Sequence, residues 1–580
     1  MKRFWILCIA CGLTVQIVLA SSPFNPSQDT APTLVPPTLV PTQDSGIGDA
    51  LPSESAIARI QRDGKVRVGT LFNAPPFGER NLRGEVSGFD ADLARSMAEA
   101  WGVEIEFVQV TRQTAIDTLR GGTVDLLIAA QTHRRELDAL VEFSQTYYFG
   151  AQAMMVREGD SAASLADMAN RKIGLVVGNE NSHNAIQAWQ RRSGLAVTVQ
   201  TYLTLDQALV ALVNSEVDGV VDNRLRFKQI ITQPGVARLL DEAVAPEPYA
   251  VVVRRQDVGM RNLVNRTLQY LVRNGRMNEI HQAHFAGASY PSLNVPVWDG
   301  LGEEAPQPGQ VSPELQYPTQ YVIPRMQEQG RIRIAGLASV PEDAPESQRR
   351  LDTLNRAVIE AIVARWGVQA EFIPDSAANA LDLVAGGQAD LAVGATLDWA
   401  WADRVDFTNP YLLHGDRLMV RAEDEITGFN DLRGRWVAIF ANEPGAADRV
   451  NAWAESVNTG VEIFTIVREQ DAAFHILVEN NADVVFGDSL KLIPHVQANP
   501  DLLRLSTRGD VEDPWYSRRY VAFAVPRNDI DFRLLVEYTL QELVLDGTLA
   551  GLLQPVMLAE DVPAFDVWPG PSTYLGFTLG

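Results

Sequence analysis

The sequence predicts an α/β protein built from two copies of one domain. Two stretches, Lys65 to Phe285 and Arg331 to about Pro555, repeat the same order of strands and helices. Within each stretch, short β-branched strands alternate with helical segments. This spacing is typical of βαβ units and favours a mostly parallel sheet with helices on both faces. A period of about 265 residues is far too long for a solenoid repeat, so the repeated unit is a whole domain.

The elements follow one order in both copies. Each copy opens on a short strand, KVRVGT from Lys65 and RIRIAG from Arg331. A long helix comes next and ends at an aromatic-Gly step, in LARSMAEAWG and AVIEAIVARWG. A second helix closes on a Gly pair and an apolar strand, TLRGGTVDLLIAA and LVAGGQADLAVGA, and both copies then reach an aromatic turn, VEFSQTYY and VDFTNPYL.

Composition fits an ordinary globular protein of several domains. The chain has 580 residues, of which 46% are hydrophobic and 21% charged. Each copy is long enough to bury its own core. The formal net charge of −24 argues against nucleic acid as a partner, because phosphate binding requires clustered Lys and Arg.

The N-terminus predicts export. Residues 1–20 place Lys2 and Arg3 before an apolar run that ends in Val18-Leu19-Ala20, the layout of a secretory signal peptide. Whether this segment is cleaved, lipidated or retained as an anchor stays open. Both cysteines lie within it, so no disulfide is expected in the remainder. The expected location is extracytoplasmic: periplasmic, secreted or tethered to the outer face of the cytoplasmic membrane.

Proline-rich segments divide the chain. Residues 21–53 are rich in Pro, Ser and Thr and predict a disordered tether. Residues 286–319 are a Pro/Gly-rich linker between a first domain at 54–285 and a second, divergent domain at 320–558. The tail, residues 559–580, carries aromatic side chains, and whether they dock back on a domain stays open.

Two extended segments of the first copy predict a hinge. The strand FGAQAMMVREG leaves one lobe from Phe149, and PYAVVVRRQD returns to it from Pro248. Two crossings between lobes allow a few residues to absorb a closing rotation. This divides the first domain into lobe 1, about 54–150 and 252–285, and lobe 2, about 155–248. The second copy has equivalents in LHGDRLMVRAED and RYVAFAVPRND.

The first copy contains Pro75-Pro76-Phe77, then Gly88-Phe89-Asp90, and later the aromatic turn with Tyr147-Tyr148. This order of motifs resembles the type II periplasmic solute-binding proteins, in particular their amino-acid-binding branch, family 3. In the second copy the early motifs are absent, and Asn355 and Ala357 stand where Asp90 and Asp92 would be. The resemblance implies two bilobed domains, each holding a ligand between lobes that a two-strand hinge joins. The first copy carries the family motifs at Pro75-Pro76-Phe77, Gly88-Phe89-Asp90, Asp92-Leu93, Val124-Asp125, Thr132, Phe143-Ser144 and Tyr147-Tyr148.

Carried over residue by residue, the resemblance implies a set of ligand contacts in the first copy. Thr132 takes the place of the hydroxyl that binds a ligand carboxylate, but Leu137 replaces the expected arginine. Asn223 replaces the aspartate that pairs with an α-ammonium. Arg112 and Asp222 could supply the two missing charges, one positive and one negative, from neighbouring positions. The implied contacts are Arg112, Gln131, Thr132, Asn181, Ser182, Asp222 and Asn223.

Other interpretations of these residues stay open. Arg112 also fits a solvated rim arginine, and Asn181 and Ser182 also fit simple helix capping. Arg134 and Arg135 are expected to be solvated. In the second copy Thr396 and Asp488 hold the hydroxyl and aspartate places, and Trp401 replaces the arginine. That copy is expected either to bind a different solute or to serve as a structural or protein-contact module.

The prediction is therefore a non-enzymatic protein that captures an amino acid or related carboxylate, for delivery to an ABC transporter, without cofactor or metal. One alternative is an extracytoplasmic sensor or interaction module acting through a membrane partner. Another is a cleft enzyme such as a dehydratase, for which His133 and His183 are the available acid and base groups. The sequence contains no HExxH, no phosphate loop with Lys and no nucleophile elbow. Zinc binding by His281 and His284 is not expected without further ligands.

Overall fold

The computed structural model describes residues 54–578 apart from 231–234, 319, 338–343, 345, 375, 467–471, 509–512, 559–564 and 576. The signal segment and the tether predicted for residues 1–53 lie outside the described residues. Within the described ranges no helix is long and apolar enough to cross a membrane.

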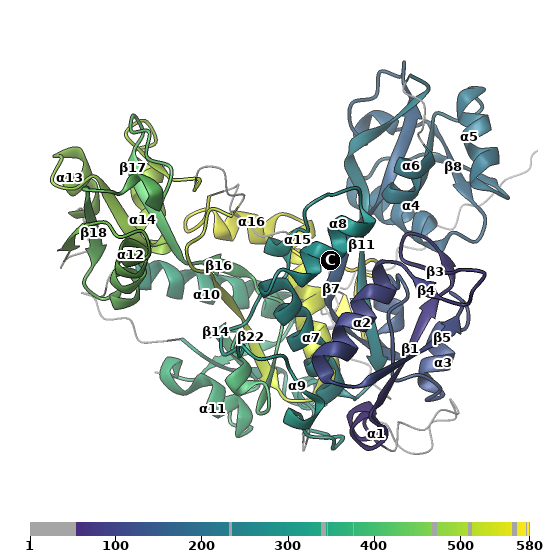
Figure 1. Ribbon diagram of the computed structural model, residues 1–580, viewed down its shortest axis with the longest axis horizontal. Helices are drawn as coiled ribbons and strands as arrows, with labels where there is room; N and C mark the ends of the chain where they lie inside the picture. Colours follow the sequence, from purple (N-terminus) through teal and green to yellow (C-terminus); the bar gives the residue numbers. More distant parts are fainter. Residues whose placement is uncertain are drawn as a thin grey trace, which may run out of the picture. The chain divides into compact units, whose positions relative to one another are not determined.

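The first repeat is built on one eight-stranded sheet in the order β5-β1-β6-β11-β7-β10-β8-β9 (Figure 1). Three short strands, β2, β3 and β4, form a separate small sheet. The strands are β1 (Lys65–Leu71), β2 (Asn73–Ala74), β3 (Gly78–Arg80), β4 (Val86–Ser87), β5 (Glu104–Val110), β6 (Leu126–Leu127), β7 (Val141–Arg157), β8 (Lys172–Val176), β9 (Thr198–Tyr202), β10 (Gly219–Asn223) and β11 (Ala237–Arg254).

Helices cover this sheet and supply separate apolar cores for its two halves. Helix α2 is an example, because its buried stripe, which includes Leu93 and Met97, faces one of these cores. The helix ends where Gly102 adopts φ 66°. The helices are α1 (Ala56–Asp63), α2 (Phe89–Trp101), α3 (Ala115–Arg120), α4 (Glu180–Ser193), α5 (Leu205–Val213), α6 (Arg224–Ile230), α7 (Val258–Arg273) and α8 (Arg276–His284), with 3₁₀ turns η1 (Arg135–Leu137) and η2 (Ala166–Met168).

The two long strands of this sheet form the predicted hinge. Strands β7 and β11 run antiparallel, and their pairing extends from Val141 opposite Arg254 to Arg157 opposite Ala237. Strand β6 of lobe 1 pairs with β11, and β10 of lobe 2 pairs with β7. The crossing strands therefore belong to both lobes, which confirms the fold with two lobes and a two-strand hinge.

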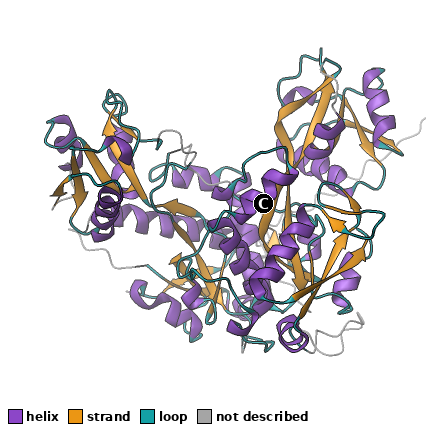
Figure 2. Cartoon of the chain, viewed as in Figure 1, coloured by secondary structure: helices purple, strands orange, loops and turns teal. Residues whose placement is uncertain are grey.

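The second repeat divides the same plan between two sheets (Figure 2). One has the order β13-β12-β14-β22-β15 with β16 also on β22, and the other has the order β19-β18-β20-β17-β21. Its strands are β12 (Arg331–Ala335), β13 (Gln369–Phe372), β14 (Leu391–Thr396), β15 (Val405–Phe407), β16 (Leu412–His414), β17 (Asp416–Arg421), β18 (Trp436–Phe440), β19 (Glu462–Ile466), β20 (Val484–Asp488), β21 (Leu503–Leu505) and β22 (Arg519–Pro526).

Helices again flank both sheets of the second repeat. They are α9 (Val322–Gln329), α10 (Glu346–Trp366), α11 (Ala380–Ala385), α12 (Pro444–Ser456), α13 (Ala472–Val478), α14 (Ser489–Ala498), α15 (Ile530–Leu545) and α16 (Thr548–Leu553). The 3₁₀ turns are η3 (Ser292–Asn294) and η4 (Pro308–Gln310) between the repeats, then η5 (Ala377–Asn379), η6 (Trp399–Trp401) and η7 (Phe429–Asp431). A two-stranded ribbon, β23 (Thr573–Tyr574) and β24 (Phe577–Thr578), follows.

One glycine accounts for the interrupted crossing strand of the second repeat. Gly415 separates β16 from β17 with φ 158°, and a Cβ at this position would lie 2.0 Å from the carbonyl oxygen of Ser517. Only glycine fits there without displacing the neighbouring backbone. The strands on either side of this residue join different sheets, β16 beside β22 and β17 beside β20 and β21.

The Val124-Asp125 and Ala389-Asp390 motifs have a structural role. Asp125 forms ion pairs with Arg59 of α1 and with Arg67 of β1. Asp390 does the same with Arg325 of α9 and with Arg333 of β12. In each repeat the motif therefore ties the first helix to the first strand, far from the lobe junction.

The predicted linker is packed against the protein over part of its length. Tyr290 and Val295 are buried, and the Tyr290 hydroxyl donates to the backbone oxygen of Tyr147 over 3.0 Å. In the tail, Trp568 is 5% exposed, which answers the open question about its aromatic side chains: this one is docked.

Candidate functional site

A buried carboxylate lies at the junction of the two lobes in the first repeat. Glu247 belongs to β11, is 4% exposed and faces Gly150 of β7 in the hinge register. Its oxygens accept hydrogen bonds from four side chains: Asn181 Nδ2 at 2.6 Å, Gln152 Nε2 at 2.7 Å, Asn223 Nδ2 at 2.7 Å and Thr132 Oγ1 at 3.4 Å.

Three of these four donors are predicted contact residues, and a strand or helix positions each of them. Thr132 follows β6 in lobe 1. Asn181 lies in the first turn of α4, and Asn223 ends β10 and caps α6 by accepting from the backbone N–H of Leu225 over 2.9 Å. The structure thus brings Thr132, Asn181 and Asn223 together from both lobes around one carboxyl group.

The lobes are in direct contact at this point. Asn181 Nδ2 donates to Thr132 Oγ1 over 3.1 Å, and Arg134 of lobe 1 pairs with Glu180 of α4 at 2.9 Å. The expectation that Arg134 is simply solvated is therefore wrong, because its guanidinium is used to link the lobes. This arrangement corresponds to a closed cleft.

The other predicted residues of the first repeat surround this centre. Ser182 is fully buried and donates to Gln152 Oε1 over 2.7 Å, so it orients the amide that binds Glu247. Gln131 turns back on its own loop, with Nε2 donating to the Thr132 carbonyl over 3.3 Å. Asp222 is buried and lies 3.1 Å from Arg226, beside the predicted Asn223.

Electrostatics single out Glu247. Burial raises the pKa of Glu247, and the amides of Asn223, Asn181 and Gln152 lower it in part. Burial likewise raises the pKa of Asp222, which Arg226 lowers. Arg112 is exposed, and its positive charge lowers the pKa of both carboxyls. Within the described part of the chain, the groups that hydrogen-bond to Glu247 are all neutral.

Sequence reasoning missed Glu247 and Gln152. Gln152 lies in the first segment predicted to be a hinge strand, and Glu247 immediately precedes the second, which begins at Pro248. The available signal was an acidic residue between two prolines, Pro246 and Pro248, immediately before an apolar strand. Burying an ionisable side chain in such a strand costs free energy unless hydrogen bonds or an opposite charge compensate for it.

The two predicted residues of the second repeat are not joined in the same way. Thr396 is exposed at the end of β14. Asp488 is buried, lies 2.8 Å from His414 Nδ1 and 3.1 Å from Arg519 Nη1, and caps α14. Burial by itself raises the pKa of Asp488, but His414 and Arg519 bring it below its ordinary value. The charge of Asp488 is already balanced by the protein.

His133 and Arg135, which follow the predicted contact Thr132, pack against other parts of the chain. His133 is buried between the rings of Phe143 and Trp568, with centroids 4.0 and 3.8 Å away, and Nε2 lies 2.9 Å from Asp138 Oδ1. Arg135 was expected in solvent but is 5% exposed, because it contacts the second repeat. His133 is therefore a packing residue in this structure.

The other histidines weighed for chemistry have local partners. His183 Nε2 lies 3.3 Å from the Val176 carbonyl, and His281 Nδ1 lies 2.8 Å from that of Ala288. His284 pairs with Asp92 at 2.7 Å. Among the described residues no group of three or more His, Cys, Asp or Glu is arranged to hold a metal ion.

Both repeats match the family model of the bacterial extracellular solute-binding proteins, family 3, over residues 66–287 and 349–557. The chain belongs to this family. It is therefore a solute-binding protein with a tandem repeat of the type II fold, as the order of motifs predicted. The family consists mainly of binding proteins and not of enzymes.

Individual relatives match about one repeat of the chain. Over 234 residues it is 25% identical to the ABC transporter glutamine-binding protein GlnH of Bacillus subtilis (strain 168), covering 40% of this chain and 84% of that protein. It is 29% identical over 202 residues to a glutamine-binding protein of Geobacillus stearothermophilus, covering 34% and 75%. Among solved structures, an ancestral arginine-binding protein bound to arginine is 30% identical, with 38% of this chain and 98% of that chain covered and a TM-score of 0.32.

Proposed function

We propose that the first repeat captures an amino acid outside the cytoplasm and delivers it to an ABC transporter. The observation that carries this proposal is the buried Glu247 carboxylate, held at the lobe junction by Thr132, Asn181 and Asn223. The names of the relatives, which are amino-acid-binding and ABC transporter proteins, support the same class of solute.

The charge pattern suggests how the solute is oriented. The groups that hydrogen-bond to Glu247 are neutral, and an α-ammonium group would add a cation in direct contact with the carboxylate, beside the longer-range charge of Arg112. We assign the ammonium to Glu247 and Asp222, and the carboxylate of the solute to Thr132 and the rim guanidinium of Arg112. Ligand binding then stabilises the closed form that Asn181 and Thr132 already make.

For the second repeat we propose a structural role. Asp488 is paired with Arg519 and hydrogen-bonded to His414, so an incoming ammonium would have to displace partners that the protein already supplies. The proposal is for binding without catalysis, since the candidate base His133 is enclosed by aromatic rings.

Thermal unfolding of the full chain tests this assignment. The probes are L-arginine, L-glutamine, L-glutamate and, as a solute without ammonium, succinate. A probe at 100 times its dissociation constant adds about 2.7 kcal/mol to the native state. We expect at least one amino acid to raise the unfolding temperature and succinate to leave it unchanged.

Matched variants then separate the two clefts. Glu247→Gln keeps the shape of the side chain and removes its charge, and we expect at least roughly 100-fold weaker amino-acid binding, the scale of losing a charged partner. Asp488→Asn is the control in the second repeat and should leave the affinity unchanged. Unchanged affinity in Glu247→Gln, or binding of succinate alone, would show that the orientation proposed above is wrong.

A further inference from the structure

The segment after each repeat contains the same short motif. Val297-Trp298-Asp299-Gly300 follows the first repeat, and Val567-Trp568-Pro569-Gly570 follows the second. We call these segments the first arm and the second arm. Both glycines have positive φ, 70° and 146°, and a Cβ on either would come within 2.7 Å of a residue in the opposite repeat. Each arm therefore lies tightly against the other copy.

The tryptophan of each arm stacks on a ring of the opposite repeat. Trp298 packs on Trp399 with centroids 4.3 Å apart and meets the edge of Phe407 at 5.4 Å. Trp568 packs on His133 of the first repeat with centroids 3.8 Å apart. The arms are thus exchanged: each begins in one repeat and docks on the other.

The polar contacts of the arms are also duplicated. The backbone N–H of Trp298 donates to Gln269 Oε1, and that of Trp568 donates to Gln541 Oε1, both over 3.0 Å. Gln269 and Gln541 occupy the same position in α7 and α15, two helices of 16 residues each. Each glutamine also binds across the interface: Gln269 accepts from Trp399 Nε1 at 2.8 Å, and Gln541 from Arg135 Nη2 at 3.0 Å.

The backbone hydrogen bonds between the arms and the repeats are duplicated as well. The N–H of Trp399 donates to the Asp299 carbonyl over 3.0 Å, and the N–H of Arg135 donates to the Pro569 carbonyl over 2.9 Å. Both donors open a 3₁₀ turn, η6 in the second repeat and η1 in the first. Equivalent positions of the two repeats therefore bind equivalent positions of the two arms.

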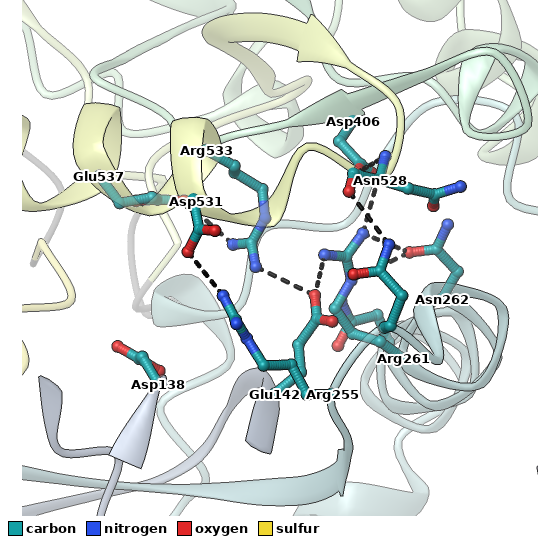
Figure 3. A network of polar contacts seen from close by, with 12 residues as sticks. Asp138, Glu142, Arg255, Arg261, Asn262, Asp406, Asn528, Asp531, Arg533 and Glu537 are labelled. Carbon is teal, nitrogen blue, oxygen red and sulfur yellow. Dashed lines mark hydrogen bonds and ion pairs between the residues drawn. The ribbon is translucent and has the colours of Figure 1, made fainter. Parts of the chain in front are cut away.

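A buried ionic cluster lies between the repeats (Figure 3). Arg261 of α7 reaches Asp406 at 2.8 Å, and Arg533 of α15 reaches Glu142 at 3.0 Å. The arginines share one position in their helices, and Glu142 and Asp406 are each the second residue of β7 and β15. In Figure 3 both guanidinium groups point to the Glu142 carboxylate, which also pairs with Arg261.

Reciprocal contacts of this kind define an isologous interface, in which one surface patch meets its own counterpart. We propose that the chain is a fused dimer of solute-binding domains: the partner of each lobe 1 surface is the second copy, and each exchanged arm completes the opposite copy. The paired surface consists of α7, α15, the beginnings of β7 and β15, and the arms. Arg192 of α4 in lobe 2 also interacts electrostatically with Glu542 of α15.

Cleavage of the folded chain tests the proposal without using a ligand. A protease site is inserted after Glu314, which is exposed between the first arm and the second repeat. After cutting, each fragment retains its own arm. Size-exclusion chromatography over a dilution series then measures the dissociation constant of the two fragments. We expect them to elute together at micromolar concentration.

Variants identify the surface that holds the fragments together. Trp568→Ala should weaken association at least roughly 30-fold, as expected of an aromatic anchor worth about 2 kcal/mol. Gly570→Ala, which keeps both tryptophans and adds a methyl group against Arg135, should weaken it in the same direction. Trp436→Ala is the control, because Trp436 is 50% exposed on β18. Fragments that separate at once after cutting, or arm variants that match the control, would overturn the proposal.

Discussion

The two repeats preserve one scaffold but differ at the junction of their lobes. In both, a buried tryptophan indole donates to a threonine hydroxyl over 2.8 Å, Trp101 to Thr267 and Trp366 to Thr539. At the lobe junction the first repeat presents Glu247 among neutral amides, whereas in the second Asp488 is paired with Arg519 and hydrogen-bonded to His414. The contact within the scaffold is the same in both repeats, whereas the contacts at the lobe junction differ.

A second difference lies beneath the cleft. In the first repeat Tyr147 donates to the carboxyl of Asp90 over 2.9 Å, and in the second Tyr411 donates to the amide oxygen of Asn355 over 2.7 Å. Burial raises the pKa of Asp90 to about 7. The neutral residue at the same position removes a titrating group from the second repeat without changing the tyrosine contact.

The largest expected effect concerns this position, which is Asp90 in the first repeat and Asn355 in the second. An acid whose pKa is raised on folding stabilises the native state fully below its unfolded pKa of about 4 and loses that contribution as pH rises to about 7. Asp90→Asn should therefore gain stability relative to the wild type between pH 4 and pH 8, by up to about 4 kcal/mol. At both pH values the variant also carries the constant cost of one lost acceptor, because Asp90 accepts from the Tyr147 hydroxyl and from the backbone N–H of Ala130. Urea unfolding at both pH values measures this.

The reverse variant is the control for that result. Asn355→Asp should introduce the same loss of stability between pH 4 and pH 7 into the second repeat. If Asp90→Asn were equally stable relative to wild type at both pH values, burial would not be raising the pKa of this carboxyl.

The hinges offer the next comparison. Gly415→Ala places a Cβ against the Ser517 carbonyl in a backbone conformation that L-residues avoid, and should cost roughly 3 kcal/mol. Ala151→Gly, in the continuous crossing strand of the first repeat, should cost only about 1 kcal/mol. Urea unfolding of both variants gives the difference. Equal costs would mean that the interruption of the second crossing strand does not depend on Gly415.

The smallest expected difference tests the shared scaffold. Thr267→Val and Thr539→Val each leave a buried indole N–H without an acceptor, which costs about 1–3 kcal/mol. Because the two contacts have the same length and burial, the two losses should agree within about 0.5 kcal/mol. Thermal unfolding of the two single variants measures this. A clearly unequal pair would show that the scaffold, and not only the cleft, has diverged.

Sequence alone determined the repeated α/β unit, the two-strand hinge and the membership of the family, because these depend on periodicity and on local motifs. It also named Thr132, Asn181 and Asn223, which belong to separate motifs at strand ends and helix starts. Their role as ligand contacts stays a proposal. Tertiary structure decided what lies between these motifs: Glu247 reaches the junction only because β11 crosses both lobes beside β7.

The docking of the linker and the tail was not predicted from the sequence, because it too depends on contacts between distant segments. Their Pro and Gly content predicted a linker and left the role of the tail open, and the repeated Val-Trp-x-Gly motif is too short to indicate docking by itself. The burial of Trp568, and the contacts of Arg135 and His133 with the second arm, join residues more than four hundred positions apart in sequence. Sequence patterns report the local periodicity of a chain, whereas contacts between distant segments depend on how two complete surfaces fit together.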